Sequence, residues 1–206
     1  MKRKILAIVS AFVALGLGNV FATPQNIIIT RHGEKVIPHG FCLDLQGLER
    51  ASTFPHYFTE HEPYAALQIT HVFAAYDKNP APYIRCQQTC QPTADFLKLP
   101  LNLDFKPEQI KEIAQEILTN PKYDKANLLL CWEHRHIRPL VMALGAEDPG
   151  FWAENIFDQV YMLTFDGNSK PKFQQFLQKL LFGDRATIKD QPTPSPSVSV
   201  KCPEVK

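Results

Sequence analysis

Two arginines and two histidines stand at the ends of apolar segments in this sequence. Arg31 and His32 directly follow a β-branched run at 26–30, while Arg85 and His134 follow two further apolar runs. Parallel strands end at one edge of a sheet, and open α/β folds bind ligands at that edge. Basic groups gathered there would repel one another unless an anion lay between them. The spacing therefore predicts a binding site for an anion.

These residue types suit phosphoryl transfer. Arginine presents a planar fork of donors and stays charged at any working pH. A neutral histidine holds a free lone pair near pH 7, so it can act as the nucleophile. A phosphoryl group spreads its charge over three oxygens during transfer, and fixed cations stabilise that charge. We therefore expect a reaction that needs no metal and no cofactor.

A metal site is the alternative for part of this set. Cys131, His134 and His136 have the spacing Cys-x-x-His-x-His, which matches no strong zinc pattern. The sequence also contains no glycine-rich phosphate loop and no Gly-x-Ser-x-Gly nucleophile motif. We therefore expect these three residues to bind no metal.

Four motifs occur in this chain in the order that one enzyme family shows. They are Arg-His-Gly-Glu at 31–34, Gly-x-x-Arg-Ala at 47–51, Arg-x-x-Gln-Thr at 85–89, and His134 before a helix. With this order over about residues 26–165, the chain resembles the histidine phosphatase superfamily, most of all its small phosphatase-type members. The resemblance implies a phosphoglycerate mutase-like fold, a three-layer α/β/α sandwich with a mostly parallel central sheet.

The resemblance also implies a role for each motif. His32 is expected to attack the phosphorus and become phosphorylated, and water then hydrolyses the phosphohistidine. Arg31, Arg85 and His134 are expected to hold the phosphoryl group, with Glu34 as a further substrate-binding residue. The implied activity is that of a phosphatase acting on a small phosphorylated substrate.

An alkyl leaving group needs a proton as it departs, and the motifs do not define the donor. Glu133, next to His134, is our predicted catalytic acid, and Glu60, Glu62 and Asp77 are further candidates. Because strand residues alternate between faces, Glu133 points away from His134 unless the strand has already ended. The other alternative is a substrate whose leaving group is good enough to need no donor.

The residue after the second histidine departs from the family pattern. Members often have glycine at this position, whereas this chain has Arg135. Its long cationic side chain either reaches the pocket, where it would favour an acidic substrate, or points to solvent. The sequence supports both placements equally.

Two other functions fit the same motifs. One is a phosphoglycerate mutase-like phosphotransferase. Mutases serve cytosolic glycolysis, whereas the N-terminal segment described next predicts export, and mutases usually carry longer insertions around the pocket. The other is a non-catalytic protein that binds a phosphorylated ligand in the same pocket. The presence of both arginines and both histidines favours catalysis over binding alone.

The first 22 residues have the pattern of a secretory signal peptide. Basic residues at 2–4 precede a largely apolar run at 5–21, which ends at the small residue Ala22. We expect cleavage after Ala22, a periplasmic or secreted location, and no stable membrane association after cleavage. The alternative is a retained anchor, but the apolar run is shorter than the ~20 residues that a spanning helix needs.

The composition is typical of a folded domain. The chain has 206 residues, of which 45% are hydrophobic and 21% are charged. Its formal charge is +1, and it becomes −2 without the first 22 residues, which hold three basic residues and no acidic one. A general nucleic-acid binder needs a basic surplus, so we expect no such partner. We expect a histidine phosphatase domain at 23–188 and a Pro/Ser-rich tail at 189–206.

Five cysteines follow the predicted cleavage site, and the odd number leaves at least one of them unpaired. Cys131 lies in an apolar run, which favours a buried free thiol. Cys202 lies in the polar tail and could attach that tail to the domain, but the spacing does not define its partner. Cys86 and Cys90 are one helical turn apart, which disfavours a bond between them.

Short apolar runs alternate with helix-like segments, the pattern of a layered α/β fold. We expect strands at 26–30, 71–76, 127–132 and 160–165. Apolar residues recur at helical spacing around 110–118 and 173–181, which predicts two helices, the second ending at Gly183.

Overall fold

The computed structural model describes residues 23–36, 40–77, 83–167, 170–193, 198 and 200–202. The predicted signal peptide at 1–22 lies outside the described residues. No helix in the described ranges combines the length and the apolar character needed to cross a membrane.

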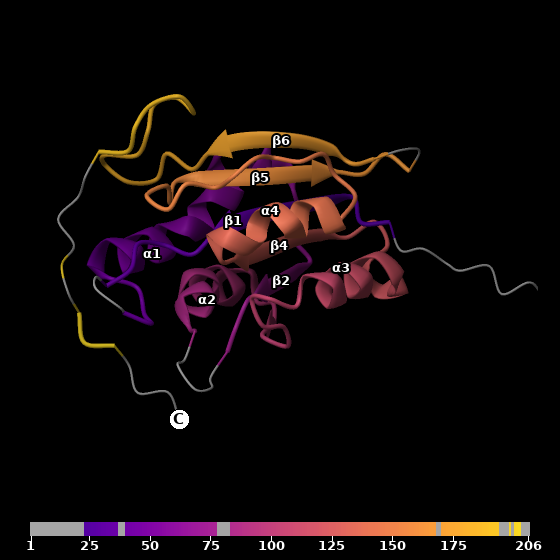
Figure 1. Ribbon diagram of the computed structural model, residues 1–206, viewed down its shortest axis with the longest axis horizontal. Helices are drawn as coiled ribbons and strands as arrows, with labels where there is room; N and C mark the ends of the chain where they lie inside the picture. Colours follow the sequence, from indigo (N-terminus) through magenta and orange to yellow (C-terminus); the bar gives the residue numbers. More distant parts are fainter. Residues whose placement is uncertain are drawn as a thin grey trace, which may run out of the picture.

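A six-stranded sheet forms the centre of the fold (Figure 1). The strands are β1 (Asn26–Arg31), β2 (His71–Ala74), β3 (Leu101–Asn102), β4 (Asn127–Trp132), β5 (Gln159–Thr164) and β6 (Lys172–Leu177). Their order in the sheet is β3-β2-β4-β1-β5-β6. Only β5 runs against its neighbours, since it pairs antiparallel with both β1 and β6. The described sheet is therefore mostly parallel, as the sequence predicted.

Helices cover both faces of this sheet. They are α1 (Leu45–Glu60), α2 (Arg85–Leu97), α3 (Ile110–Thr119) and α4 (His134–Ala143), with short 3-10 turns η1 (Tyr64–Ala66) and η2 (Pro121–Tyr123). Helix α1 packs against α2, and α3 packs against α4. Two adjacent residues of β4 contact the helical layers on opposite faces of the sheet. The Cys131 thiol lies beside Cys86 and Cys90 of α2, while the Trp132 indole donates to the Pro107 carbonyl, 2.8 Å away, just before α3.

Strands β1 and β4 are buried on both faces, which explains why their sequences are apolar without alternation. All six residues of β1 pair in parallel register with β4, from Asn26 opposite Asn127 to Arg31 opposite Trp132. Residues 128–132 are fully buried, because helices cover both faces of a parallel sheet. The strands predicted at 26–30, 71–76, 127–132 and 160–165 are thus confirmed, with shifted ends.

The helix predicted at 173–181 is wrong, because this segment contains strand β6. All six residues of β6 pair with β5. Phe173 packs on Tyr161, with ring centroids 4.9 Å apart, and Phe176 packs on Tyr64 at 5.4 Å. Positions 173 and 176 lie on opposite faces of the strand. Because both faces of β6 make apolar contacts, its apolar residues recur at the spacing that is typical of a helix.

The C-terminal segment is attached to the loop before α1. Cys202 forms a disulfide with Cys42, and the Leu45 amide donates to the Val198 carbonyl, 3.3 Å away. The partner of Cys202, which the sequence left open, is thus Cys42. The other cysteines, Cys86, Cys90 and Cys131, are free and buried, in agreement with the expectation for Cys131.

Candidate active site

The carboxyl ends of β1 and β4 bring the predicted basic residues together. Arg31 lies opposite Trp132, so His32 leaves β1 beside the start of α4. His134 is the first residue of α4, and Arg85 is the first residue of α2. The edge of the sheet therefore gathers all four residues that the sequence singled out.

His32 is held as a neutral imidazole with a defined tautomer. It is buried, with 1% of its surface exposed, and its Nδ1 lies 2.7 Å from the carbonyl oxygen of Gly33. Because a carbonyl only accepts hydrogen bonds, Nδ1 carries the proton and Nε2 keeps the lone pair. Burial, with the charges of Arg31 and Arg85, lowers the pKa of His32 well below its ordinary value. The imidazole is therefore neutral at pH 7.

Three backbone carbonyls hold the guanidinium of Arg31. Its Nη1 donates to the carbonyl oxygens of Ala153, Glu154 and Ile156 at 3.4, 2.5 and 2.9 Å. The guanidinium carbon lies 4.0 Å from the ring centroid of Phe157. Burial lowers the pKa of Arg31 to about 10, so this side chain remains charged at neutral pH.

Arg85 lies near His32 and stacks on an aromatic ring of its own. Its guanidinium lies over the ring of Tyr83, 4.7 Å from the centroid, and Tyr83 meets the imidazole edge-on with centroids 6.1 Å apart. The two arginines are thus each backed by an aromatic ring, and both place positive charge at the same histidine.

The Arg-x-x-Gln-Thr motif ties α2 to the two segments beside it. The Thr89 hydroxyl accepts from the Gly33 amide at 2.9 Å and donates to the Arg85 carbonyl at 2.8 Å. The Gln88 side chain accepts from the Leu43 amide at 2.9 Å. These residues therefore position the loop that carries His32.

Three buried guanidinium nitrogens at this edge have no hydrogen-bond partner in the described structure. They are Nε and Nη2 of Arg31 and Nε of Arg85. Leaving a buried donor unpaired costs about 1–3 kcal/mol, so such groups usually have a partner. Three phosphoryl oxygens are suitable acceptors for these nitrogens.

Glu133 caps α4 and lies among basic side chains. It accepts from the Arg135 amide at 3.1 Å and from Arg135 Nε at 3.0 Å. Nδ1 of His136 and Nδ1 of His134 each lie 2.9 Å from its carboxylate. Burial would raise the pKa of Glu133, but His134 and Arg135 lower it below its ordinary value. Glu133 is therefore ionised at neutral pH, which does not suit the predicted proton donor.

His134 and Arg135 take different positions around this carboxylate. The His134 side chain is 13% exposed, and its Nδ1 contacts the Glu133 carboxylate without the alignment of a hydrogen bond. The Arg135 side chain is 75% exposed. Of the two placements that the sequence left open, the structure has the one in which Arg135 reaches solvent.

Glu34, predicted to bind substrate, is held by Arg50. Nη2 of Arg50 lies 2.7 Å from a carboxylate oxygen of Glu34 and 2.7 Å from one of Asp184, while Nη1 donates to Gln178 at 2.9 Å. Burial would lower the pKa of Arg50, but the two carboxylates raise it above its ordinary value. Glu34 therefore anchors the loop after His32, and its carboxylate is already neutralised.

The glycine of the Gly-x-x-Arg-Ala motif allows this anchoring. A Cβ atom on Gly47 would overlap the carbonyl oxygen of Glu34, so only glycine lets α1 approach the loop. Asp44 caps the helix by accepting from the Gly47 amide at 2.9 Å. Arg50 lies one turn later on the same face of α1.

The other candidate acids lie in two places. Glu60 is exposed in the last turn of α1, where its carboxylate lies 3.0 Å from Nδ1 of His56. At a rise of 1.5 Å per residue, the last turn of α1 lies about 22 Å from the start of the helix. Glu62 follows it and is also exposed. Asp77 lies nearer the site, because it bridges to Tyr83 and pairs with Lys106 at 3.3 Å.

The sequence predicted that Cys131, His134 and His136 bind no metal. Among the described residues, no group of three or more histidine, cysteine, aspartate or glutamate side chains could hold a metal ion.

Sequence reasoning missed the aromatic and backbone parts of the site. Phe157 and Tyr83 stand in segments without a motif, and the carbonyls that hold Arg31 belong to an irregular loop at 153–156. Thr89 and Gln88 were visible within the motif, but their role depends on which loops meet them in space.

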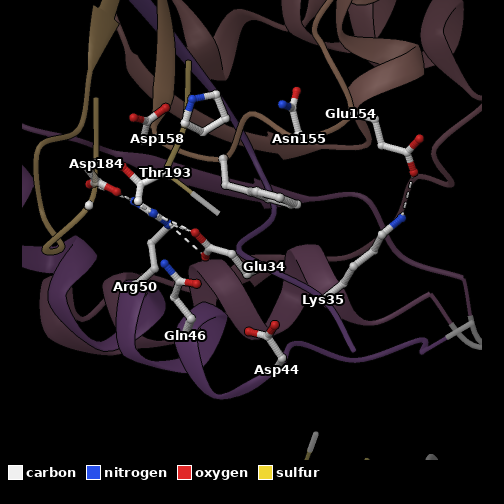
Figure 2. Close-up of a pocket in the computed structure, with 13 residues that line it drawn as sticks. Glu34, Lys35, Asp44, Gln46, Arg50, Glu154, Asn155, Asp158, Asp184 and Thr193 are labelled. Carbon is white, nitrogen blue, oxygen red and sulfur yellow. Dashed lines mark hydrogen bonds and ion pairs between the residues drawn. The ribbon is translucent and has the colours of Figure 1, made fainter. Parts of the chain in front are cut away.

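A cavity of about 500 Å³ lies beside the pair of Glu34 and Arg50 (Figure 2). The loop after β1, the start of α1, the loop before β5 and the C-terminal segment line it. Figure 2 shows Arg50 between Glu34 and Asp184 on one side, with the pair of Lys35 and Glu154, 3.2 Å apart, on the other. Phe157 lines the cavity as well.

Comparisons with known proteins identify the fold. The chain is similar to the protein histidine phosphatase SixA complexed with tungstate, with a TM-score of 0.55 and 18% identity over 74% of this chain and 97% of that one. It is also similar to phosphoglycerate mutase from Plasmodium falciparum, with a TM-score of 0.52 and 13% identity over 84% and 99%. No family model matches the sequence, and no curated protein matches it.

Both of these structures are members of the histidine phosphatase superfamily. This chain therefore has the phosphoglycerate mutase-like fold, with a six-stranded mixed sheet and helices on both faces. The fold class predicted from the ordered motifs is confirmed.

Proposed function

We propose that this protein is an exported phosphomonoesterase that works through a phosphohistidine on His32. The carrying observation is the neutral imidazole of His32, with its proton on Nδ1, near two arginines with unpartnered buried donors. This arrangement combines a nucleophile with fixed positive charge for the phosphoryl oxygens. The similarity to SixA, whose structure holds the oxyanion tungstate, supports a phosphatase.

The reaction proceeds in two steps. Nε2 of His32 attacks phosphorus, and the bond to the leaving oxygen breaks while that oxygen takes the bonding pair. Arg31, Arg85 and His134 hold the phosphoryl oxygens during this transfer. Water then attacks the phosphohistidine, the N–P bond breaks, and inorganic phosphate leaves with His32 neutral again.

Glu133 acts in this scheme as a positioning residue. Its ionised carboxylate caps α4 and contacts His134, so it fixes the start of the helix that carries the second histidine. The leaving oxygen takes its proton from solvent, or is stable enough as an anion to need none. Good leaving groups are therefore the favoured substrates.

Hydrolysis of p-nitrophenyl phosphate between pH 4 and 8 tests the activity. We expect turnover by the purified protein, its loss in His32→Ala, and its retention in His56→Ala, a matched change at an exposed histidine on α1. Acid-labile phosphate should be trapped on the wild-type protein only. A folded wild type with no turnover and no trapped phosphate would exclude the enzyme.

Export has support of two kinds. The sequence pattern at 1–22 is that of a signal peptide, and the disulfide between Cys42 and Cys202 suits an oxidising compartment. N-terminal sequencing of the protein from cell fractions tests the proposal. We expect Thr23 as the first residue in the periplasmic or secreted fraction, whereas an intact N-terminus in the cytosol would contradict it.

A further inference from the structure

His136 lies close to the phosphoryl site but has no part in the reaction as described so far. Its Nδ1 is 2.9 Å from Oε2 of Glu133, the residue that caps α4. An ionised carboxylate only accepts hydrogen bonds, so Nδ1 of His136 carries a proton and donates it. The His136 side chain is 31% exposed and that of Glu133 is 4% exposed. His136 therefore holds a buried carboxylate from its solvent side.

The spacing along α4 explains how one carboxylate reaches two histidines. His134 is the first residue of the helix and His136 is the third. A side chain at the third position can reach back to the cap, whereas His134 is turned from His136 by about 200° around the helix axis. The two histidines thus leave α4 in different directions. Glu133, at the end of the helix, contacts both of them.

The two carboxylate oxygens of Glu133 have separate partners. Oε2 accepts from the Arg135 amide at 3.1 Å and from His136 at 2.9 Å. Oε1 accepts from Nε of Arg135 at 3.0 Å and lies 2.9 Å from Nδ1 of His134. Both donors to Oε2 belong to the first turn of α4, so together they fix the plane of the carboxylate. The direction of Oε1, and hence its position beside His134, follows from that plane.

His136 is the less exposed of the two side chains that donate to Glu133. The Arg135 side chain is 75% exposed, against 31% for His136. Exposed ion pairs of long side chains contribute little, because water competes for the charges and the side chain loses freedom. Of these two side chains, His136 therefore has the greater influence on the orientation of the carboxylate.

His134 depends on where Oε1 points. Its Nδ1 is buried and has no hydrogen-bond partner in the described structure, although Oε1 of Glu133 lies 2.9 Å away. Buried donors normally have an acceptor, and a small change in the plane of the carboxylate decides whether Oε1 serves as one. To hold a phosphoryl oxygen from Nε2, the His134 ring needs a proton on that nitrogen as well. An ionised carboxylate beside the ring offsets the resulting positive charge.

We propose that His136 is a positioning residue of the phosphoryl site, which holds the carboxylate of Glu133 against His134. His136 itself touches no reacting atom. It acts through Glu133 on His134, and His134 holds the phosphoryl group. This inference deepens the proposed phosphatase activity and rests on it.

Two substitutions at His136 test the need for its donor. His136→Leu removes the donor, whereas His136→Asn places an amide N–H close to the position of Nδ1. We expect kcat for p-nitrophenyl phosphate to fall about fivefold in His136→Leu and to stay within about twofold of the wild type in His136→Asn. His136→Ala, which favours the helix, should repeat the loss. Urea unfolding of each variant gives the folded fraction, and kcat is expressed per folded molecule.

A double-mutant cycle tests the route through Glu133. If His136 acts through this carboxylate, His136→Leu should have no further effect on kcat once Glu133→Gln is present. The matched control is His56→Leu, because it removes a histidine–glutamate contact of 3.0 Å, between His56 and Glu60 on α1. The control should leave kcat unchanged.

The outcomes separate this inference from the function beneath it. Turnover by the wild type with an unchanged kcat in His136→Leu would overturn the positioning role and keep the phosphatase. Equal losses in His136→Leu and His136→Asn, or independent losses in the double variant, would overturn that role as well. No turnover by the folded wild type would overturn both proposals.

Discussion

Nδ1 of His32 lies 2.7 Å from the carbonyl oxygen of Gly33, and this contact determines which ring nitrogen can react. Nδ1 must carry the proton, so Nε2 holds the lone pair. We therefore predict that the phosphoryl group becomes attached to Nε2. NMR of the trapped phosphoprotein, prepared under alkaline conditions, distinguishes the two isomers. A phosphoryl group on Nδ1 would contradict this prediction, because the imidazole ring would then have to rotate and break its contact with Gly33 before it reacts.

The low pKa of His32 predicts a loss of stability in acid. Its pKa in the folded protein lies well below the ordinary value, which is near 6.5 in an unfolded chain. Between these values the unfolded chain binds a proton that the folded protein does not, so stability falls as the pH falls below about 6.5. The slope from this one group is at most about 1.4 kcal/mol per pH unit.

Urea unfolding of the wild type and His32→Asn at pH 7 and pH 5 measures this effect. The difference between the two proteins isolates His32 from the other histidines, and carboxylates titrate mostly below this window. We expect the wild type to lose more stability than the variant over these two pH units. Equal losses would mean that His32 keeps an ordinary pKa in the folded protein.

Glu133→Gln separates positioning from proton donation. The ionised carboxylate caps α4 and contacts His134, so its loss should lower kcat by about tenfold through the position of the second histidine. A positioning role predicts equal loss with p-nitrophenyl phosphate and with a simple alkyl phosphate. A proton donor would instead make the loss much greater with the alkyl phosphate, because only that leaving group needs the proton.

The ion pairs of Arg50 predict a large effect on folding. Arg50→Ala leaves Glu34 and Asp184 without their shared cation, and breaking such a buried pair costs about 3–5 kcal/mol. Arg138→Ala is the control, since it removes a surface pair with Asp148 and should change stability little. Denaturant unfolding compares the two variants. Similar stabilities for both would contradict a structural role for the Arg50 cluster.

The disulfide between Cys42 and Cys202 closes a loop of 160 residues in sequence. Its removal in Cys42→Ser with Cys202→Ser should destabilise the protein by about 2–4 kcal/mol, because the unfolded chain gains freedom. Thermal unfolding with and without a reductant checks this. The reductant should lower the Tm of the wild type and leave that of the double variant unchanged; an effect on both would point to a different bond.

Local patterns predicted the elements that carry the chemistry. The apolar runs before Arg31 and before Glu133 predicted β1 and β4, because strands buried on both faces have no room for polar residues. The spacing of Ile110, Ile113 and Ile117 predicted α3, since one face of that helix meets the core. The same logic failed at β6, where Phe173 and Phe176 find aromatic partners on opposite faces of an edge strand.

Sequence by itself predicted that His32, Arg31 and Arg85 lie at one edge of the sheet, because the ordered motifs place them at strand ends that a parallel sheet must bring together. Only the tertiary structure decided what each charged group faces. Glu34 meets Arg50 instead of a phosphate, and Glu133 is surrounded by His134 and Arg135 and so stays ionised. Glu34 and Arg50 lie 16 residues apart and meet only through packing, while Glu133 contacts its neighbours because β4 ends and α4 begins at this point. In both cases the charge state of a side chain follows from its surroundings and not from its type alone.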